Sequence, residues 1–206
     1  MKKVRYIYLL LIILFINAVY SQDKERKSQW KLTTEIGSVS LEAKNKFKVN
    51  ASLHGGLIGG EFFVGRNTSL ITGIEIIRAR ANFNDVFGNQ QFLTNEYITI
   101  PLSFKFSGNR EKNIFLFYSA GIYGAYLYKN RTEDVLNSLV ITEKRLGFNF
   151  GIHYEIGTQF KINEKSNFTL AFKSKTDLLN YYYKASSQVF KMTEYYTLQL
   201  GFGFSF

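Results

Sequence analysis

Apolar and polar residues alternate with a period of two along the end of the chain. In residues 195–206, Tyr196 and every second residue after it are apolar, while threonine, glutamine, glycine and serine fill the positions between. This alternation predicts a β-strand with one apolar face. About 12 residues suffice for a tilted strand to cross a bilayer, and strands persist in a membrane only within a closed barrel. The pattern therefore predicts a transmembrane β-barrel.

Seven further stretches have strand-like character and would complete this barrel. Residues 97–106 and 146–162 alternate most regularly, whereas residues 114–128 are apolar on both faces and leave their register open. The other predicted strands are 30–41, 47–64, 69–81 and 168–176. We therefore predict an all-β fold, a closed antiparallel up-and-down eight-stranded transmembrane β-barrel.

The predicted strand 47–64 contains an irregularity. Its first half places Val49, Ala51 and Leu53 on one face and Lys48 and His54 on the other, which predicts that the three apolar residues face lipid. Continued alternation would then turn the carboxylate at position 61 outward. A bulge at the glycine pairs 55–56 and 59–60 would restore the phase, so we predict one there.

The connections between the predicted strands differ in length. After a short first link at 42–46, brief turns alternate with longer polar segments at 82–96 and 129–144 and a tyrosine-rich segment after 176. Outer-membrane barrels have short periplasmic turns and longer extracellular loops. The pattern predicts that both termini are periplasmic and that the long segments are extracellular loops.

The amino terminus carries an export signal in this interpretation. Residues 1–21 contain Lys2, Lys3 and Arg5, then an apolar stretch too short for a membrane helix, then Ser21 before a charged segment. We predict a cleaved signal peptide at 1–21 and a barrel domain at 22–206. Without the signal peptide the net charge of +10 falls to +7. An exported chain of this kind is not expected to bind nucleic acid.

Composition supports a barrel whose closure supplies its stability. The chain has no cysteine, so neither disulfides nor thiolate metal sites hold the fold. Aromatic residues make up 17% of the sequence. A soluble lipid-binding barrel, with its apolar face inward, would show the same alternation. The signal peptide, the aromatic content and the terminal phenylalanine favour the membrane barrel.

Polar residues on the inner face predict a network inside the lumen. An eight-stranded barrel is just wide enough for side chains to fill it. Charges there need partners, and both signs are present. A gated ion path is a sharper alternative, and His153 beside Glu155 raises a catalytic one, although no serine nucleophile is marked in the sequence. No cofactor or metal is expected. The predicted inward set is Glu35, Lys48, His54, Glu75, Lys105, Asn149, His153, Glu155, Lys161, Lys173 and Lys175.

Basic residues near the predicted outer ends of the strands suggest contacts with lipid. Arg78, Arg80, Lys144 and Arg145 fall where the outer leaflet would present the phosphates of lipopolysaccharide. Charge-assisted hydrogen bonds to phosphate are strong. We therefore predict lipid-phosphate contacts at these four residues.

Two short motifs resemble a known family. The segment 97–102, Tyr-Ile-Thr-Ile-Pro-Leu, followed by Lys105, resembles the Tyr-x-x-Ile-Pro-Leu segment of PorT-like outer-membrane β-barrel proteins of Gram-negative bacteria, and residues 120–124 are similar to their glycine-bearing central strand. The resemblance implies an eight-stranded barrel in the outer membrane. It also implies a link to a protein secretion machinery as one alternative.

The function expected from the sequence is that of a non-enzymatic envelope protein. Its extracellular loops would serve membrane integrity, adhesion or interaction with other envelope proteins. The alternatives are a secretion accessory and a soluble periplasmic lipid-binding barrel. The expected partners are outer-membrane lipids including lipopolysaccharide, and the barrel-assembly machinery, which would contact the last strand at Phe206.

Overall fold

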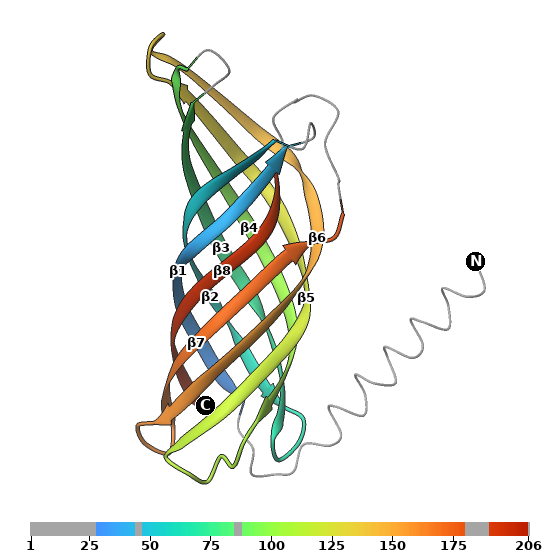
Figure 1. The fold of residues 1–206 in the computed structure, drawn as a ribbon. Helices are drawn as coiled ribbons and strands as arrows, with labels where there is room; N and C mark the ends of the chain where they lie inside the picture. Colours follow the sequence, from blue (N-terminus) through green and yellow to red (C-terminus); the bar gives the residue numbers. More distant parts are fainter. Residues whose placement is uncertain (1–27, 44–46, 85–87, 180–189, 206) are drawn as a thin grey trace, which may run out of the picture.

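The protein forms one closed β-barrel. The computed structural model describes residues 28–43, 47–84, 88–179 and 190–205. Neighbours in sequence pair as antiparallel strands throughout, and the first strand closes the barrel against the last (Figure 1). The predicted fold class, an all-β closed up-and-down barrel of eight strands, is confirmed. The predicted signal peptide at 1–21 and the terminal Phe206 lie outside the described residues.

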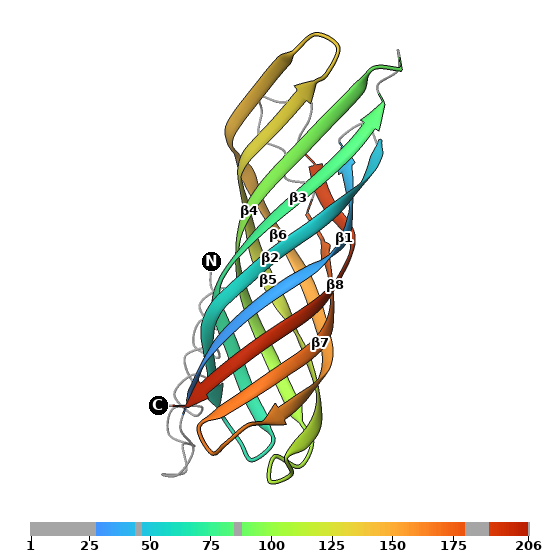
Figure 2. The same cartoon turned by 90° about the vertical axis from the view of Figure 1, so that its left-hand side faces the viewer.

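The strands are long and strongly tilted (Figures 1 and 2). Their lengths range from 12 residues in β7 to 23 in β6. Among the described residues no helix is long and apolar enough to cross a membrane. The strands are β1 Gln29–Ala43, β2 Lys48–Phe63, β3 Thr68–Asn84, β4 Gln90–Ser107, β5 Ile114–Asp134, β6 Leu139–Lys161, β7 Ser166–Asp177 and β8 Phe190–Ser205.

Both ends of the barrel chain lie at the same rim. Gln29 at the start of β1 pairs with Ser205 at the end of β8, and the figures show this lower rim opposite the projecting β5–β6 hairpin. An even number of antiparallel strands requires this arrangement. We refer below to this lower end and to the opposite, upper end.

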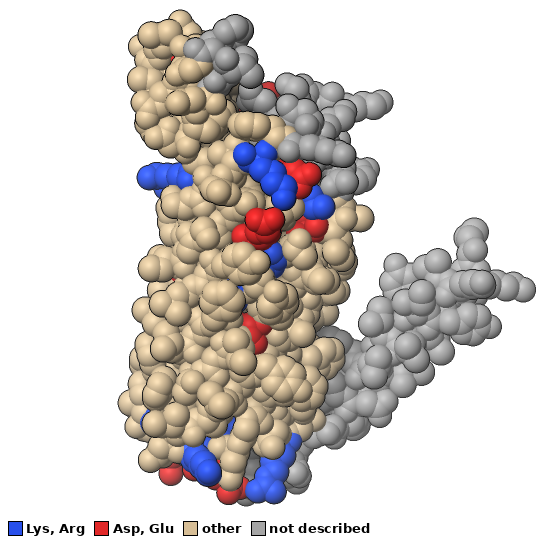
Figure 3. Space-filling model, in the orientation of Figure 1, with Lys and Arg blue, Asp and Glu red and all other residues tan. Residues whose placement is uncertain are grey.

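A wide belt of apolar side chains covers the outside of the barrel. On β8, Leu198 and Leu200 are exposed while Thr197 and Gln199 are buried, which is the orientation that the sequence predicts. Charged atoms on the visible face gather toward the two ends, with a mostly uncharged zone between them (Figure 3). The soluble alternative is therefore wrong, because it requires the apolar face to point inward. The belt includes Trp30, Ile36, Ile58, Ile74, Ile100, Phe104, Leu116, Ile156, Phe172 and Leu198.

The upper third of the barrel reverses this polarity. Val49, Ala51 and Leu53 of β2 are buried inside, while Lys48 and His54 are exposed outside. The predictions that these three apolar residues face lipid, and that Lys48 and His54 face the lumen, are wrong. No bulge interrupts β2, whose register with β1 and β3 is continuous. β2 alternates without a break, and its inward-facing side chains are apolar near the upper end of the barrel and charged near the lower end.

The apolar interior of the upper end forms a packed core. Above the membrane a strand meets water on its outer face, so the apolar side chains gain by turning inward. All of the cluster members are less than a tenth exposed, and Phe83 packs against them. The cluster comprises Val39, Leu41, Val49, Ala51, Leu53, Ile77, Ala79, Ala81, Leu93, Tyr97, Tyr123, Ala125, Leu127, Met192 and Tyr195.

Two predicted loops are largely strands. β4 begins at Gln90, inside the segment predicted as the loop 82–96. The segment predicted as the loop 129–144 is a paired hairpin of β5 and β6, in which Asp134 pairs with Leu139. The polar sequence there does not reflect a lack of regular structure: residues 139–142 meet water on both faces, while Asn130 and Thr132 of β5 are buried polar residues. The open register of β5 is also settled, since Phe117, Ser119 and Tyr123 face inward and Leu116, Tyr118 and Ile122 face outward.

Candidate functional site

The lumen holds buried charges of both signs. Among the described residues, four buried lysines face four buried glutamates inside the barrel, and Asp177 is buried there as well. A charge removed from water is tolerated only when a partner and hydrogen bonds replace its hydration. The pairing of opposite charges accounts for a highly charged interior in a narrow barrel. The four lysines and four glutamates are Lys31, Lys105, Lys173, Lys175, Glu35, Glu61, Glu75 and Glu155.

Glu75 is the centre of the upper layer of charges. Its carboxylate accepts hydrogen bonds from the ammonium groups of Lys173 and Lys175 and from the hydroxyl of Thr99. Lys173 Nζ also lies 3.4 Å from Glu35 Oε2, and Tyr195 donates a 2.5 Å hydrogen bond to Glu35. These contacts join β1, β3, β4, β7 and β8 across the lumen.

A second layer of charges lies nearer the lower rim. Lys105 Nζ lies 3.0 Å from Glu61 Oε2 and 2.8 Å from Gln159 Oε1. Glu61 also accepts hydrogen bonds of 2.7 Å from Gln29 and 2.6 Å from Ser69. Its carboxylate is therefore bonded to neighbours on β1, β3 and β4, and Gln159 of β6 extends the layer across the barrel.

The other predicted lumen residues occupy separate positions. Glu155 Oε1 lies 3.6 Å from Lys31 Nζ. Asn149 is half-buried and donates a 2.7 Å hydrogen bond to Asp177. Asp177 also accepts a 2.6 Å hydrogen bond from the hydroxyl of Tyr123. The structure thus places Glu75, Lys105, Asn149, His153, Glu155 and Lys173 in the lumen, although in several local clusters rather than one.

His153 has a serine neighbour that its sequence position does not reveal. Ser103 Oγ and His153 Nε2 lie 2.6 Å apart, in register across β4, β5 and β6. A Ser–His pair acts as a nucleophile only when a third group orients the histidine and substrate reaches the serine. His153 Nδ1 has no hydrogen-bond partner, and both side chains are less than 5% exposed. This arrangement is that of a packed interior pair.

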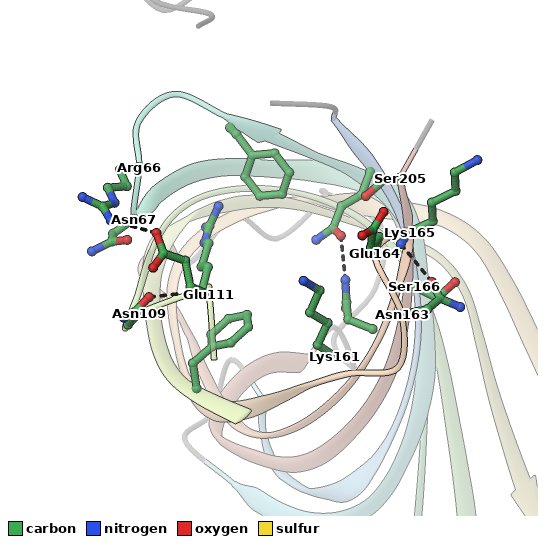
Figure 4. A pocket seen from close by; sticks show the side chains of 15 residues that line it. Arg66, Asn67, Asn109, Glu111, Lys161, Asn163, Glu164, Lys165, Ser166 and Ser205 are labelled. Carbon is green, nitrogen blue, oxygen red and sulfur yellow. Dashed lines mark hydrogen bonds and ion pairs between the residues drawn. The ribbon is translucent and has the colours of Figure 1, made fainter. Parts of the chain in front are cut away.

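Lys161 lies outside the buried network, contrary to the prediction. Its side chain is exposed and lines a cavity of about 540 Å³ at the lower rim. Figure 4 shows Lys161 at this mouth, together with Arg66 and Glu111, whose side chains form a 2.8 Å ion pair. The predicted alternation of the strand is correct here, but the strand ends at the rim. Water therefore takes the place of a carboxylate partner.

The lumen is obstructed at two levels. The charge layers fill the part that lies within the apolar belt, and the apolar core fills the part above it. An ion that moved along this axis would have to displace buried ion pairs and then cross an apolar plug. The arrangement accounts for barrel stability and offers no wide aqueous path.

A second cluster of charges lies outside, at the upper edge of the apolar belt. We call Arg78, Glu96, Tyr128 and Lys129 the outer-rim cluster. Arg78 Nη2 lies 2.6 Å from one oxygen of Glu96, and Lys129 Nζ lies 3.6 Å from the other. Register shifts in β5 between Leu127 and Lys129 allow both Tyr128 and Lys129 to reach this carboxylate.

Neighbouring charges shift the acid–base behaviour of Glu96, which lies above the membrane-spanning part of β4. Burial raises its pKa, but the hydrogen bond from Tyr128 and the positive charge of Arg78 outweigh burial and lower the pKa of Glu96 below its usual value. Glu96 is therefore a fixed anion at neutral pH, and it holds Arg78 at the surface.

The four residues predicted to contact lipid phosphate are not gathered at one place. Arg78 is half-exposed within the outer-rim cluster, and Arg80 is exposed two residues higher on the same outer face of β3. Lys144 is exposed and pairs in register with Lys129. The side chain of Arg145 lies outside the described part of the structure.

The β5–β6 hairpin carries exposed apolar side chains at its tip. Leu136 is 71% exposed and Leu139 is 53% exposed. Val135, Val140 and Ile141 are also exposed. β6 pairs with β7 only from Gly151 onward, so among the described residues the part of β6 above it pairs with β5 alone. We call residues 129–144 the upper hairpin.

Sequence reasoning missed several contributors to the interior, among them Glu61, Asp177 and Tyr123. Glu61 was not named in the predicted inward set, although the predicted bulge would have turned it inward. In the structure it is buried because the whole face of β2 that it shares with Val49 points inward. Asp177 follows the predicted strand 168–176 by one residue, so it was left in a loop. Tyr123 lies in the strand whose two apolar faces gave no register.

Comparisons with known proteins agree with this architecture. The solved structure of Neisserial surface protein A is similar at 9% identity and a TM-score of 0.51, over 87% of this chain and 97% of that one. OprG from Pseudomonas aeruginosa is similar at 9% identity and a TM-score of 0.53, over 87% of this chain and 94% of that one. At such identities the likeness shows the fold.

The family follows from the sequence itself. No curated protein sequence matches the chain. The family model for the outer membrane protein beta-barrel domain matches residues 38–178, which is more than half of the chain. An apolar belt around a polar lumen is the structure that such a domain requires in lipid. The chain belongs to the family of outer membrane protein beta-barrel domains, and its place is the outer membrane of a Gram-negative bacterium.

Proposed function

We propose that the protein is a non-enzymatic envelope protein that contacts other proteins through the upper hairpin on the extracellular side. The observation that carries the proposal is the group of five exposed large apolar residues between Val135 and Ile141. Exposed apolar patches of this kind mark interaction sites. The hairpin rises from Lys129 to Asp134, about 17 Å of strand at about 3.3 Å per residue. Lipid at the level of the belt is therefore too low to cover these residues.

The hairpin offers a rigid base for such a contact. Lys129–Asp134 of β5 pair with β6 on one side and with Gln91–Glu96 of β4 on the other. A preorganised strand pair loses little conformational entropy on binding. Adhesion and assembly with other envelope proteins would both use this surface. Membrane integrity would depend on the assembly with other envelope proteins.

The test compares two sets of substitutions in the same hairpin. Leu136→Ser with Val140→Ser removes apolar surface, whereas Arg131→Ser with Glu133→Ser removes an exposed ion pair 2.7 Å across as the matched control. Chemical cross-linking on intact cells, followed by purification from native membranes, should lose partner proteins only in the apolar variant. Heat-modifiable gel migration checks that both variants fold. Unchanged partners in the apolar variant would refute the proposal.

A role as accessory to a protein secretion system, as for PorT-like proteins, is the second candidate. The motif that suggests it contributes to the lumen, since Tyr97 and Lys105 are buried and Lys105 pairs with Glu61. The motif therefore supports a barrel interior like that of PorT-like proteins more directly than it supports a common secretion partner. Secretion subunits among the proteins that cross-link to the upper hairpin would favour this candidate, and their absence would favour adhesion or general envelope assembly.

Export and assembly complete the proposal. Residues 1–21 would direct export and be removed, so that the mature protein begins near Gln22. The last strand, β8, with Phe206 after it, would be recognised by the barrel-assembly machinery. Mass determination of the protein from outer membranes tests the first point, and deletion of Phe206 with measurement of assembled barrel tests the second.

A further inference from the structure

Two hollows lie one below the other on the outer face of β2. Gly56 and Gly60 face outward on either side of Ile58 without side chains of their own. The ring of Phe62 packs over Gly60, 2.8 Å from the place where a Cβ would stand. The upper hollow has a volume of about 460 Å³ and the lower about 350 Å³, and Ile58 lines both. We call the two hollows together the β2 furrow. Figure 2 shows β2 between β1 and β3. Side chains of these two strands line the hollows.

The walls of the β2 furrow are apolar over most of its length. Leu32 and Trp30 of β1 lie opposite Ile58 and Gly60, and Ile76 and Ile74 of β3 lie opposite Gly56 and Ile58. The six residue steps from His54 to Gly60 span about 20 Å at about 3.3 Å per residue. With a strand tilt of about 40° this is about 15 Å of depth. That depth is about one leaflet of a hydrocarbon core about 30 Å thick.

The upper end of the furrow is polar and positively charged. His54 and Arg78 lie opposite each other in register, and both line the upper hollow together with Glu96 and Tyr128. Arg78 and Lys129 provide two cations against the single carboxylate of Glu96 in the outer-rim cluster. A guanidinium has five N–H donors, so the bond to Glu96 leaves Arg78 with donors for a second acceptor.

We propose that the β2 furrow binds an outer-leaflet lipid, with one acyl chain along Gly56, Ile58 and Gly60 and a headgroup phosphate at Arg78 and His54. The lipid is lipid A, the phosphorylated glycolipid of lipopolysaccharide. The apolar walls of the β2 furrow suit an acyl chain, and the cations at its upper end suit the phosphate of the headgroup. A second barrel offers less, because its own apolar belt would meet this cationic end without a compensating charge. The proposal is independent of the upper hairpin.

Trp30 provides a direct probe, because it is the only tryptophan of the chain and lines the lower hollow. The full protein, purified from outer membranes, is reconstituted in phosphatidylcholine vesicles. Lipids with brominated acyl chains quench tryptophan on contact. Brominated phosphatidic acid, which carries a phosphate monoester, should quench Trp30 more strongly than an equal fraction of brominated phosphatidylcholine. Unbrominated lipid A should restore the fluorescence, and dephosphorylated lipid A should not.

Variants separate the furrow from the general lipid surface. Arg78→Gln should weaken the apparent affinity for brominated phosphatidic acid about tenfold, the factor that corresponds to about 1.4 kcal/mol. Thr34→Phe should fill the upper hollow and reduce quenching, because Thr34 faces Gly56. Thr158→Phe is the matched control on the outer face of β6, and it should change nothing.

Several results would overturn the proposal. Equal quenching by the two brominated lipids would mean that the furrow does not select a phosphate monoester. Competition by phosphatidic acid but not by lipid A would mean that the lipid is a phospholipid. Quenching that falls as the protein-to-lipid ratio rises would mean that a second copy of the chain covers Trp30. A response of the Thr158→Phe variant equal to that of Thr34→Phe would remove the specific role of the furrow.

Discussion

Glu75 compensates two buried lysines at once, so its charge matters more than its size. Glu75→Gln keeps the shape of the side chain but leaves Lys173 and Lys175 short of a counter-charge. Breaking a buried ion pair by removing one partner costs about 3–5 kcal/mol. We expect a loss of this order in the free energy of unfolding, measured by urea titration of the barrel in vesicles with Trp30 fluorescence. Glu111→Gln, in an exposed ion pair, should leave the unfolding curve unchanged.

The outer-rim cluster gives the stability a pH dependence. The pKa of Glu96 is lowered in the fold, so its contribution is fully present above the ordinary value of 4.5 and disappears as the pH falls through the lower, folded value. Glu96→Gln should therefore destabilise the barrel at neutral pH and match the unaltered protein in strong acid. Urea titrations across this pH range measure the difference. A difference that persists undiminished in acid would contradict this account.

Single residues of the interior could be predicted only in part from the sequence. Alternation alone indicates that Glu75, Lys105, Glu155 and Lys173 share the lumen face. It cannot give their partners, because pairing across the lumen joins residues such as Lys31 and Glu155, on strands far apart in the chain. For Lys161 the alternation predicts the correct face of the strand. It does not predict that the side chain is exposed, because exposure depends on where the rim lies.

At the scale of the strand, β2 and β3 pair through two facing glycines. Gly59 and Gly73 face each other inside the barrel, and a Cβ on Gly73 would lie against the Ile58 carbonyl oxygen and 2.6 Å from the Gly59 Cα. Gly73→Ala should destabilise the barrel by about 1–3 kcal/mol, as overpacking does. Gly108→Ala, whose Cβ would lie 3.4 Å from its nearest neighbour, is the matched control in the same urea titration. Equal effects would show that the backbone gives way at Gly73.

Strands within the belt were predictable, and strands that leave it were not. β8 lies mostly within lipid, so one rule of alternation holds along most of its length. β2 passes from lipid to water, and its outer face changes from Phe62 and Ile58 to His54 and Lys48. Local sequence does not mark that boundary, so the change of solvent was interpreted as a bulge. The upper hairpin was assigned to a loop for the same reason.

At the scale of the molecule, the barrel is a filled cylinder. Its charged layers and apolar plug together occupy the lumen above the cavity at the lower rim. We expect planar bilayers that contain the purified protein to show no stable porin-sized conductance, because an eight-stranded barrel leaves room for side chains only. A steady conductance that persists at low applied voltage would contradict the filled lumen.

The reversal of polarity between the belt and the upper end is the central claim, and spin labels test it most directly. The chain has no cysteine, so single cysteines can be introduced at Ile100, Leu198 and Asn50 and labelled with nitroxide in vesicles. Labels at Ile100 and Leu198 should be relaxed by oxygen, which dissolves in lipid, and the label at Asn50 by a water-soluble nickel complex. Relaxation of the labels at 100 and 198 by nickel, with protection at Asn50, would contradict the account.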